Sequence, residues 1–331
     1  MLKPTFEIGC LGKLPLYEEF IRYQADAPEV DFLDSWLREG INLWNSKEGE
    51  AFDRNYDETP PYFFFLHLKN SKRLLLGVFI LSRDKGGRKN PFTIFILINH
   101  KKFNYNQIYI PIIFSSFLKS ATELAQRGWQ DKDINQFLKQ VDMLNSRLPE
   151  NPKKYQDSFI SYLETKTNLT FWSSLYGSFE DSRRNLVWQN LIQILLPLRQ
   201  FKIQNFSLGL KFPLDSNNES CAFEIPFWLY LAGRLYGSSI TTPVLFWNQQ
   251  AENSQAGMFL FLQPPTPDNF MYLVNPDLEG EKLCVLDRDG ADQQENLQSS
   301  LSKLSGDLQN TLHRLINSPE ITLREILQAS I

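Results

Sequence analysis

The sequence predicts a mixed α/β protein: a mixed β-sheet layered with helices, in two sequential domains followed by a helical tail. Short runs rich in Phe, Ile, Leu and Val alternate with segments whose apolar residues recur every three or four positions, as strands and helices require. A chain of 331 residues is long enough for two domains, each with its own core. Leucines at helical spacing follow the last predicted strand.

The chain opens with a strand that turns sharply. Gly9, Gly12 and Pro15 stand within seven residues, a density that suits neither a helix nor a central strand. The turn therefore presents Lys13 at the surface.

The rest of the first predicted domain, residues 1–148, follows in order. An amphipathic helix is expected over 28–44, with Trp36 in an aromatic stripe that faces a core. Three strands covered on both faces are expected next, then two helices that cover the sheet. The strands are expected over 62–68, 74–81 and 92–98, and the helices over 111–127 and 133–148.

The second predicted α/β domain covers residues 153–286, after the linker-like stretch Pro149-Glu-Asn-Pro152. The segment 208–213 resembles 11–15, and each precedes an aromatic-rich helix that contains Trp-Leu. We therefore hypothesise that the second domain is a diverged copy of the first. Its helices are expected over 155–164, 171–177, 186–197, 223–236 and 267–274, and its strands over 206–212, 244–247, 258–262 and 283–286.

The predicted C-terminal helical segment covers residues 292–331. Leucines recur at spacings of three and four from Leu297 to Leu315, and Pro319 separates them from a last short helix. Two interpretations stay open: a helix docked on the second domain, and a coiled-coil contact interrupted by Gly306.

Composition excludes several classes of protein. The formal net charge of −4 gives no broad basic field for nucleic acid or an anionic membrane. The apolar runs fall short of the roughly 20 residues that a membrane helix needs, and no signal-peptide core is present at the N-terminus, so we expect a cytoplasmic protein without membrane insertion. Three dispersed cysteines suit a reducing compartment, and the three isolated histidines do not indicate a metal site.

A second glycine-bearing stretch, residues 83–89, lies between two predicted strands. Four cations surround Gly86-Gly87, so they are expected to project from a tight loop held by the sheet. A partner-binding role and a merely solvated loop both stay open for this stretch. The candidate partner-binding residues are Lys13, Tyr17, Arg83, Asp84, Lys85, Arg88 and Lys89.

The sequence shows no reaction centre. Gly12-Lys13 lacks the upstream glycine and the following hydroxyl of a phosphate loop, and Gly9-x-x-Gly12 lacks the third glycine of a dinucleotide fingerprint. His67 lies in an apolar run, where a hydrogen-bonded core histidine is the better interpretation than a catalytic base. We expect no enzyme activity and no cofactor. The alternative is a nucleotide- or phosphopeptide-binding protein, or a cryptic enzyme, that uses Lys13, Arg88 and Asp84.

Two ordered motifs, Gly-x-x-Gly-Lys-Leu-Pro and Asp-x-x-Gly-Arg, flank a Trp-Leu helix, and this pattern resembles the N-terminal domain of the TagF (ImpM) family associated with bacterial type VI secretion systems. The match spans about the first 100 residues. Among the matching residues, six are expected to specify the fold: Gly9, Gly12, Pro15, Phe20, Trp36 and Gly87. The sequence departs from the family pattern at residues 16–19, where Leu-Tyr-Glu-Glu replaces Ser-Arg-Gly-Asp.

The resemblance implies a non-enzymatic cytoplasmic accessory protein. Such a protein restrains assembly of the secretion apparatus after translation by holding a forkhead-associated scaffold, or sheath or baseplate components. A binding role that used the missing arginine of the altered run does not carry over to this sequence.

Overall fold

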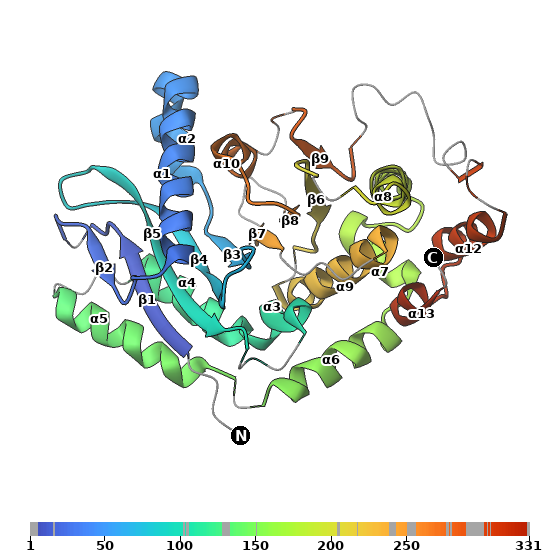
Figure 1. Ribbon diagram of the computed structural model, residues 1–331, viewed down its shortest axis with the longest axis horizontal. Helices are drawn as coiled ribbons and strands as arrows, with labels where there is room; N and C mark the ends of the chain where they lie inside the picture. The colour runs from blue at the N-terminus through green and yellow to red at the C-terminus, as the bar shows by residue number, and fades with distance from the viewer. Residues whose placement is uncertain are drawn as a thin grey trace.

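The computed structural model describes residues 6–15, 17–101, 103, 106–127, 133–149, 151–203, 206–216, 218–237, 243–249, 256–275, 278, 280–288, 301–302, 304 and 306–329. Within these residues one nine-stranded sheet runs in the order β2-β1-β5-β4-β3-β7-β8-β6-β9, with helices packed against it (Figure 1). The neighbouring strands are antiparallel except for the parallel pair β6 and β9. The predicted mixed α/β class is confirmed.

The strands are β1 (Phe6–Gly12), β2 (Ile21–Tyr23), β3 (Tyr62–Leu66), β4 (Arg73–Arg83), β5 (Lys89–Asn99), β6 (Gly209–Pro213), β7 (Val244–Asn248), β8 (Gly257–Phe261) and β9 (Leu283–Val285). The helices are α1 (Pro28–Glu48), α2 (Phe52–Glu58), α3 (Ile110–Ile113), α4 (Ser115–Arg127), α5 (Ile134–Met143), α6 (Pro152–Thr165), α7 (Asn168–Tyr176), α8 (Arg183–Gln200), α9 (Asn218–Tyr236), α10 (Pro267–Val274), α12 (Gly306–Asn317) and α13 (Leu323–Gln328). Short 3₁₀ turns lie at Gly49–Ala51, Gln107–Tyr109 and Leu144–Arg147.

The central strands are buried on both faces, as their continuous apolar sequence predicts. Successive side chains of a strand point to opposite faces, so Phe63 and Phe65 of β3 enter one core while Phe64 and Leu66 enter the other. All five residues of β3 are buried. This strand therefore contributes equally to the two sides of the sheet.

Strands β3 and β7 join the two parts of the chain into one sheet. They pair in antiparallel register from Tyr62 opposite Asn248 to Leu66 opposite Val244. Each face of the sheet consequently carries a core drawn from both parts, where the sequence suggested one core for each domain. The predicted linker falls between the 3₁₀ turn Leu144–Arg147 and α6.

Helices α1 and α10 cover one face of the sheet, and α4, α5 and α9 belong to the core on the other face (Figure 1). On the first face, Trp36 of α1 stacks on Phe246 of β7 with a ring-centroid distance of 4.6 Å. The Trp36 indole Nε1–H donates to the carbonyl of Thr266 at 2.9 Å, just before α10. Trp36 thus binds the N-terminal helix to elements from the far end of the chain.

The structure does not confirm an internal duplication. The first set of strands has the order β2-β1-β5-β4-β3, and the second has β7-β8-β6-β9. The two aromatic-rich helices also lie on opposite faces, since Trp36 and Trp228 belong to different cores. The shared Trp-Leu pattern therefore does not establish that the second part is a copy of the first.

The tail is docked on the second part of the chain, as one of the two interpretations proposed. Leu312 and Leu315 of α12 and Leu323 of α13 are buried in the core that contains α9. The Asn168 side chain donates its amide hydrogens to the carbonyls of Leu315 and Ser318, each at 3.0 Å. These leucines are not available for a coiled coil. Residues 289–300, where the predicted tail helix begins, lie outside the described residues.

Two local predictions differ from the structure. Helix α8 continues past Pro197 to Gln200, because a proline in the last turn removes only one backbone bond and the following Leu198 is buried. The short elements α2 and β2 were not predicted, since neither segment is long enough to show a clear period.

A buried carboxyl in α9 makes stability depend on pH. Glu224 is fully buried, one oxygen accepts the backbone N–H of Asp215 at 2.7 Å, and the other makes no hydrogen bond. Burial raises the pKa of Glu224 to about 8 from 4.5; the hydrogen bond from the Asp215 N–H lowers the pKa, the negative charge of Asp215 raises it, and Lys166 lowers it. Between these two pH values the folded protein retains a proton that the unfolded chain releases.

We expect the free energy of unfolding to fall as the pH rises from about 4.5 to about 8. Glu224→Gln cannot ionise, and it keeps an oxygen for the Asp215 N–H. It should raise stability at pH 7 by on the order of 2 kcal/mol and flatten this slope. Urea denaturation across the window measures both effects. An unchanged slope in the variant would show that Glu224 is not the responsible group.

Candidate functional site

The first motif turns directly against strand β5. Gly12 ends β1 with a φ of +120°, and a Cβ atom there would stand 1.9 Å from the backbone oxygen of Pro91. Only glycine fits this approach. The turn that follows carries Lys13 past the end of β5 toward the loop between β4 and β5.

The second motif closes the hairpin between β4 and β5. The backbone N–H of Asp84 donates to the Arg88 carbonyl at 3.0 Å, and Gly87 donates back to the Asp84 carbonyl at 2.9 Å. Gly87 has a φ of +83°, which explains the glycine in the turn. The loop is therefore tightly folded and holds Asp84 at its base.

The carboxylate of Asp84 connects the two motifs. One oxygen, Oδ2, lies 2.7 Å from Lys13 Nζ and 2.6 Å from Arg88 Nε, and Oδ1 accepts the Arg88 backbone N–H at 2.8 Å. The Asp84 side chain is fully buried although its partners reach the surface. The hydrogen bond from Lys13, followed by those from Arg88, holds the pKa of Asp84 well below its usual range.

Two further bonds join the motifs through the backbone. The Lys85 N–H donates to the Tyr17 carbonyl at 3.3 Å, and Arg88 Nη2 donates to the Glu18 carbonyl at 2.8 Å. These contacts bring the two motifs together on one surface. We call the joined turns, residues 13–15, 17–20 and 83–89, the motif surface.

Arg83 and Lys89 do not project from the loop as predicted. Arg83 forms a bidentate ion pair with Asp57, and Lys89 pairs with Asp53 while its ammonium lies 4.2 Å from the ring centroid of Phe52. These three partners belong to α2, the helix that sequence periodicity missed. The sequence did contain a sign of this helix, because Asp53 and Asp57 are four residues apart, the spacing that puts two side chains on the same face of a helix.

The exposed part of the motif surface carries both signs of charge. Lys85 is exposed, and the side chain of Arg88 remains 66% exposed beside the exposed Glu18 and Glu19. Tyr17 is half-buried and its hydroxyl donates to Glu19 at 3.4 Å, while Phe20 is 39% exposed. Because Asp84 neutralises part of the charge of Lys13 and Arg88, this arrangement favours a protein partner over a phosphate ligand.

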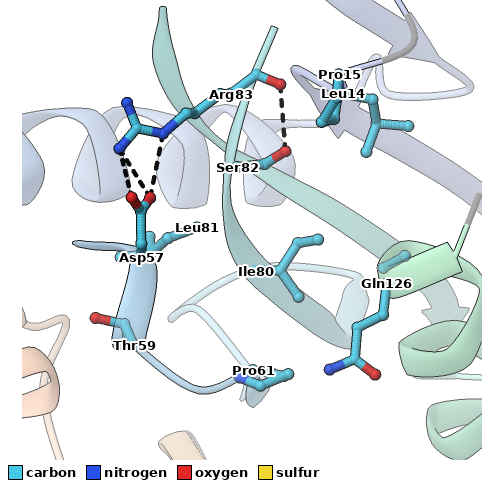
Figure 2. Close-up of a pocket in the computed structure, with 11 residues that line it drawn as sticks. Leu14, Pro15, Asp57, Thr59, Pro61, Ile80, Leu81, Ser82, Arg83 and Gln126 are labelled. Atoms are coloured by element: carbon cyan, nitrogen blue, oxygen red, sulfur yellow. Dashed lines mark hydrogen bonds and ion pairs between the residues drawn. The ribbon is translucent and has the colours of Figure 1, made fainter. Parts of the chain in front are cut away.

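A pocket of about 360 Å³ adjoins the motif surface (Figure 2). Leu14, Pro15 and Ile80 give it an apolar lining, and the Arg83–Asp57 ion pair stands on one side with Gln126 of α4 on the other (Figure 2). This pocket can accept an apolar side chain. The sequence did not indicate it, because its lining comes from four separate segments of the chain.

The other chemistry-bearing residues agree with a structural role. His67 is buried, and its Nδ1 lies 3.0 Å from Gln107 Oε1, as expected of a hydrogen-bonded core histidine. Among the residues described, no group of three or more His, Cys, Asp or Glu side chains is arranged to hold a metal ion. The described helices include none with the length and hydropathy needed to cross a membrane.

The fold and this surface define a mixed α/β protein whose N-terminal part is built around two interlocked glycine turns. Residues 9–144 match the family described as TagF N-terminal domain, type VI secretion system-associated. That part of the chain is therefore similar to the N-terminal domain of a type VI secretion system-associated family, and we refer to residues 9–144 as the TagF domain.

Comparison with solved structures finds PA0076 from Pseudomonas aeruginosa PAO1, known from a crystal structure. It aligns with a TM-score of 0.49 at 15% identity, over 83% of this chain and 96% of that chain. No curated protein matches the sequence.

Asp84→Asn should lower the melting temperature clearly more than Asp57→Asn. The first change weakens the contact of Lys13 that joins the motifs and the two contacts of Arg88 that hold the loop, all made to a buried carboxylate, whereas the exposed pair of Asp57 contributes less than about 1 kcal/mol. The depressed pKa of Asp84 contributes stability above about pH 4 that is lost as the pH falls further, so the two variants should converge in acid. Equal melting temperatures at pH 7 would contradict the central role of Asp84.

Comparing Gly12→Ala with Gly87→Ala distinguishes two causes of destabilisation, the steric clash of a new Cβ atom and the strain of a positive φ. Both glycines have a positive φ, but only the Cβ at position 12 meets other atoms. We expect Gly87→Ala to cost about 1–2 kcal/mol and Gly12→Ala about 3 kcal/mol or more. Chemical denaturation of the two variants measures this order, and the reverse order would show that β1 does not approach β5 as described.

Proposed function

We propose that this protein is a non-enzymatic, cytoplasmic regulator of a type VI secretion system. It restrains assembly after translation by binding a scaffold or structural component, such as a forkhead-associated scaffold or a sheath or baseplate protein. The family of residues 9–144 supports the association with the secretion system. The buried Asp84 contact set supports the binding role, because it holds two exposed turns in one fixed arrangement.

Restraint requires a difference in affinity. A regulator holds its partner inactive only when it binds the inactive arrangement more tightly than the active one. A rigid surface is suited to this, since a preorganised surface loses little conformational freedom on binding. The motif surface meets that condition through its bonds from Lys13, Lys85 and Arg88.

The absence of catalysis is part of the same proposal. Lys13 and Arg88, the cations that the alternative nucleotide-binding function needs, are both engaged by Asp84. A ligand present at a hundred times its dissociation constant adds about 2.7 kcal/mol of stability. A thermal shift of that size with a nucleotide or phosphopeptide, lost in Lys13→Gln, would overturn the proposal in favour of the alternative.

Lys85→Glu tests the binding surface without disturbing the Asp84 contacts. Only the backbone of Lys85 takes part in the interactions described, and its side chain is exposed. We expect the variant to keep its melting temperature and to recover secretion-system proteins several-fold less well from native cytosol, because a reversed charge opposes the complementary partner surface.

Lys154→Glu on α6 is the matched control, since Lys154 is also an exposed lysine but lies away from the motif surface. Recovery is measured by affinity capture and quantitative mass spectrometry. Equal recovery by Lys85→Glu and Lys154→Glu would place the partner contact elsewhere. Failure of the wild-type protein to recover any secretion-system component would contradict the regulatory role itself.

A further inference from the structure

A second and larger pocket lies where the two parts of the chain meet. Its volume is about 580 Å³, within the range of pockets that take small organic ligands. Its lining comes from α3, α4 and β3 of the TagF domain and from α6, β7 and the start of α9 beyond it. The motif surface does not contribute to this pocket, so its chemistry is separate from the proposed function.

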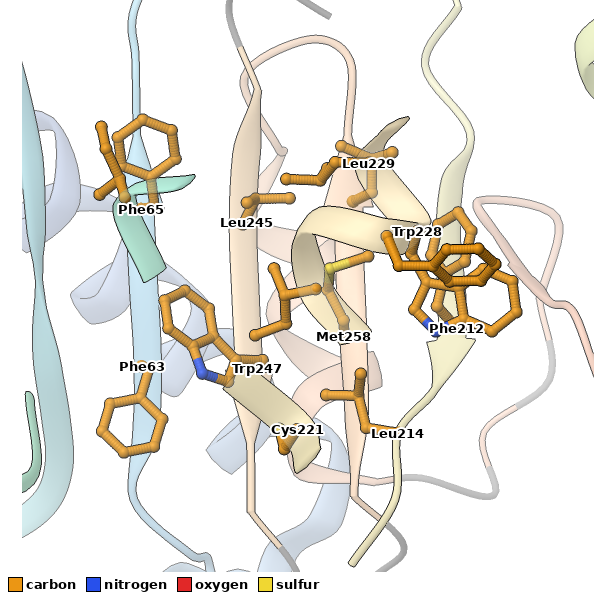
Figure 3. Close-up of a cluster of buried hydrophobic side chains, with 14 of the residues drawn as sticks. Phe63, Phe65, Phe212, Leu214, Cys221, Trp228, Leu229, Leu245, Trp247 and Met258 are labelled. Atoms are coloured by element: carbon orange, nitrogen blue, oxygen red, sulfur yellow. The ribbon is translucent and has the colours of Figure 1, made fainter. Parts of the chain in front are cut away.

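The floor of the pocket is aromatic and apolar. Phe63 of β3 and Trp247 of β7 stack with ring centroids 5.5 Å apart (Figure 3), and Cys221 of α9 also lines the pocket. Burial raises the pKa of Cys221 far above its usual value, so its thiol remains protonated and adds apolar surface. Phe223 adds another aromatic ring to the lining.

The indole N–H of Trp247 is a hydrogen-bond donor without a partner in the described part of the chain. Trp247 is only 3% exposed, yet it lines the pocket. By contrast, the buried Trp172 and Trp228 donate to Asn168 Oδ1 and to the Pro213 carbonyl. Trp44 and Trp188 also lack acceptors, but neither lines the pocket. Unlike those two donors, the Trp247 N–H is not fully buried, so it is open to the pocket, where a ligand acceptor can take its hydrogen bond.

The mouth of the pocket supplies further donors. Ser115 and Ser116 begin α4, and Lys119 follows one turn later with an exposed ammonium that makes no ion pair among the residues described. Glu123 lies one turn beyond Lys119 on the same lining. The pocket lining therefore offers hydrogen-bond donors from Trp247 to Lys119, and Glu123 is the one carboxylate among its lining residues.

We propose that this pocket binds a small amphipathic organic anion. Its ring-sized apolar body stacks on Phe63 and Trp247, an acceptor takes the indole N–H, and its negative charge lies near Lys119. Each part of the ligand then meets a group of matching chemistry that the fold leaves open. Because the lining comes from both parts of the chain, a bound ligand contacts both at once.

The probe for this site is 1-anilinonaphthalene-8-sulfonate, which has an aromatic body, a sulfonate and a fluorescence that rises in apolar surroundings. The wild-type protein should bind it saturably with one site. Trp247→Phe keeps the ring and removes the donor, so it should weaken binding about three- to tenfold. Ser116→Trp fills the mouth and should abolish binding, with the melting temperature confirming that each variant is folded.

Two charge-neutralising substitutions on α4 should change the affinity for the probe in opposite directions. Lys119→Gln should weaken binding about twofold and Glu123→Gln should strengthen it by a similar factor, while Lys139→Gln on α5 serves as the control. Stronger binding by Lys119→Gln together with weaker binding by Glu123→Gln would overturn the proposal that the ligand is an anion. Absence of saturable binding, or binding that is unaffected by Trp247→Phe and Ser116→Trp, would overturn the site.

Discussion

The pairing of β3 with β7 is the constraint on which the rest of the structure depends. Both strands are buried on both faces, so a slip of one residue would exchange every side chain between the two cores. The register from Tyr62 opposite Asn248 to Leu66 opposite Val244 is therefore strongly specified. It joins the TagF domain to the remainder of the chain as one sheet. It also places Phe63 and Trp247 side by side in the lining of the larger pocket, the one of about 580 Å³.

The TagF domain is consequently completed by residues that lie outside its own segment. Trp36, in the helix that the family motif includes, stacks on Phe246 and donates to the Thr266 carbonyl. Phe270 of α10 also packs edge-on against Trp36, with centroids 5.6 Å apart. The aromatic stripe of α1 thus has its partners in the second part of the chain, and neither part buries it alone.

Asp84 organises the motif surface by the opposite kind of interaction, a buried charge. Removing a carboxylate from water is costly unless it is paired and hydrogen-bonded, and Lys13 and Arg88 supply both conditions. The same contacts pair Lys13 and Arg88, the two cations that the alternative nucleotide- or phosphopeptide-binding function would use. What remains for recognition is a fixed shape with Lys85, Glu18 and Phe20 exposed on it. Such a mixed surface suits a protein partner.

The sequence by itself determined the local features of this protein. Glycine and proline spacing predicted the sharp turn after β1, apolar periodicity predicted α1 and the buried strands, and the order of the motifs indicated the TagF family. Only the tertiary structure decided that Asp84 is buried between Lys13 and Arg88, that Asp53 and Asp57 engage Lys89 and Arg83, and that β3 pairs with β7. The physical reason is that period and turn chemistry act within a few residues, whereas the partner of a charge or of a strand edge is set by the packing of distant segments.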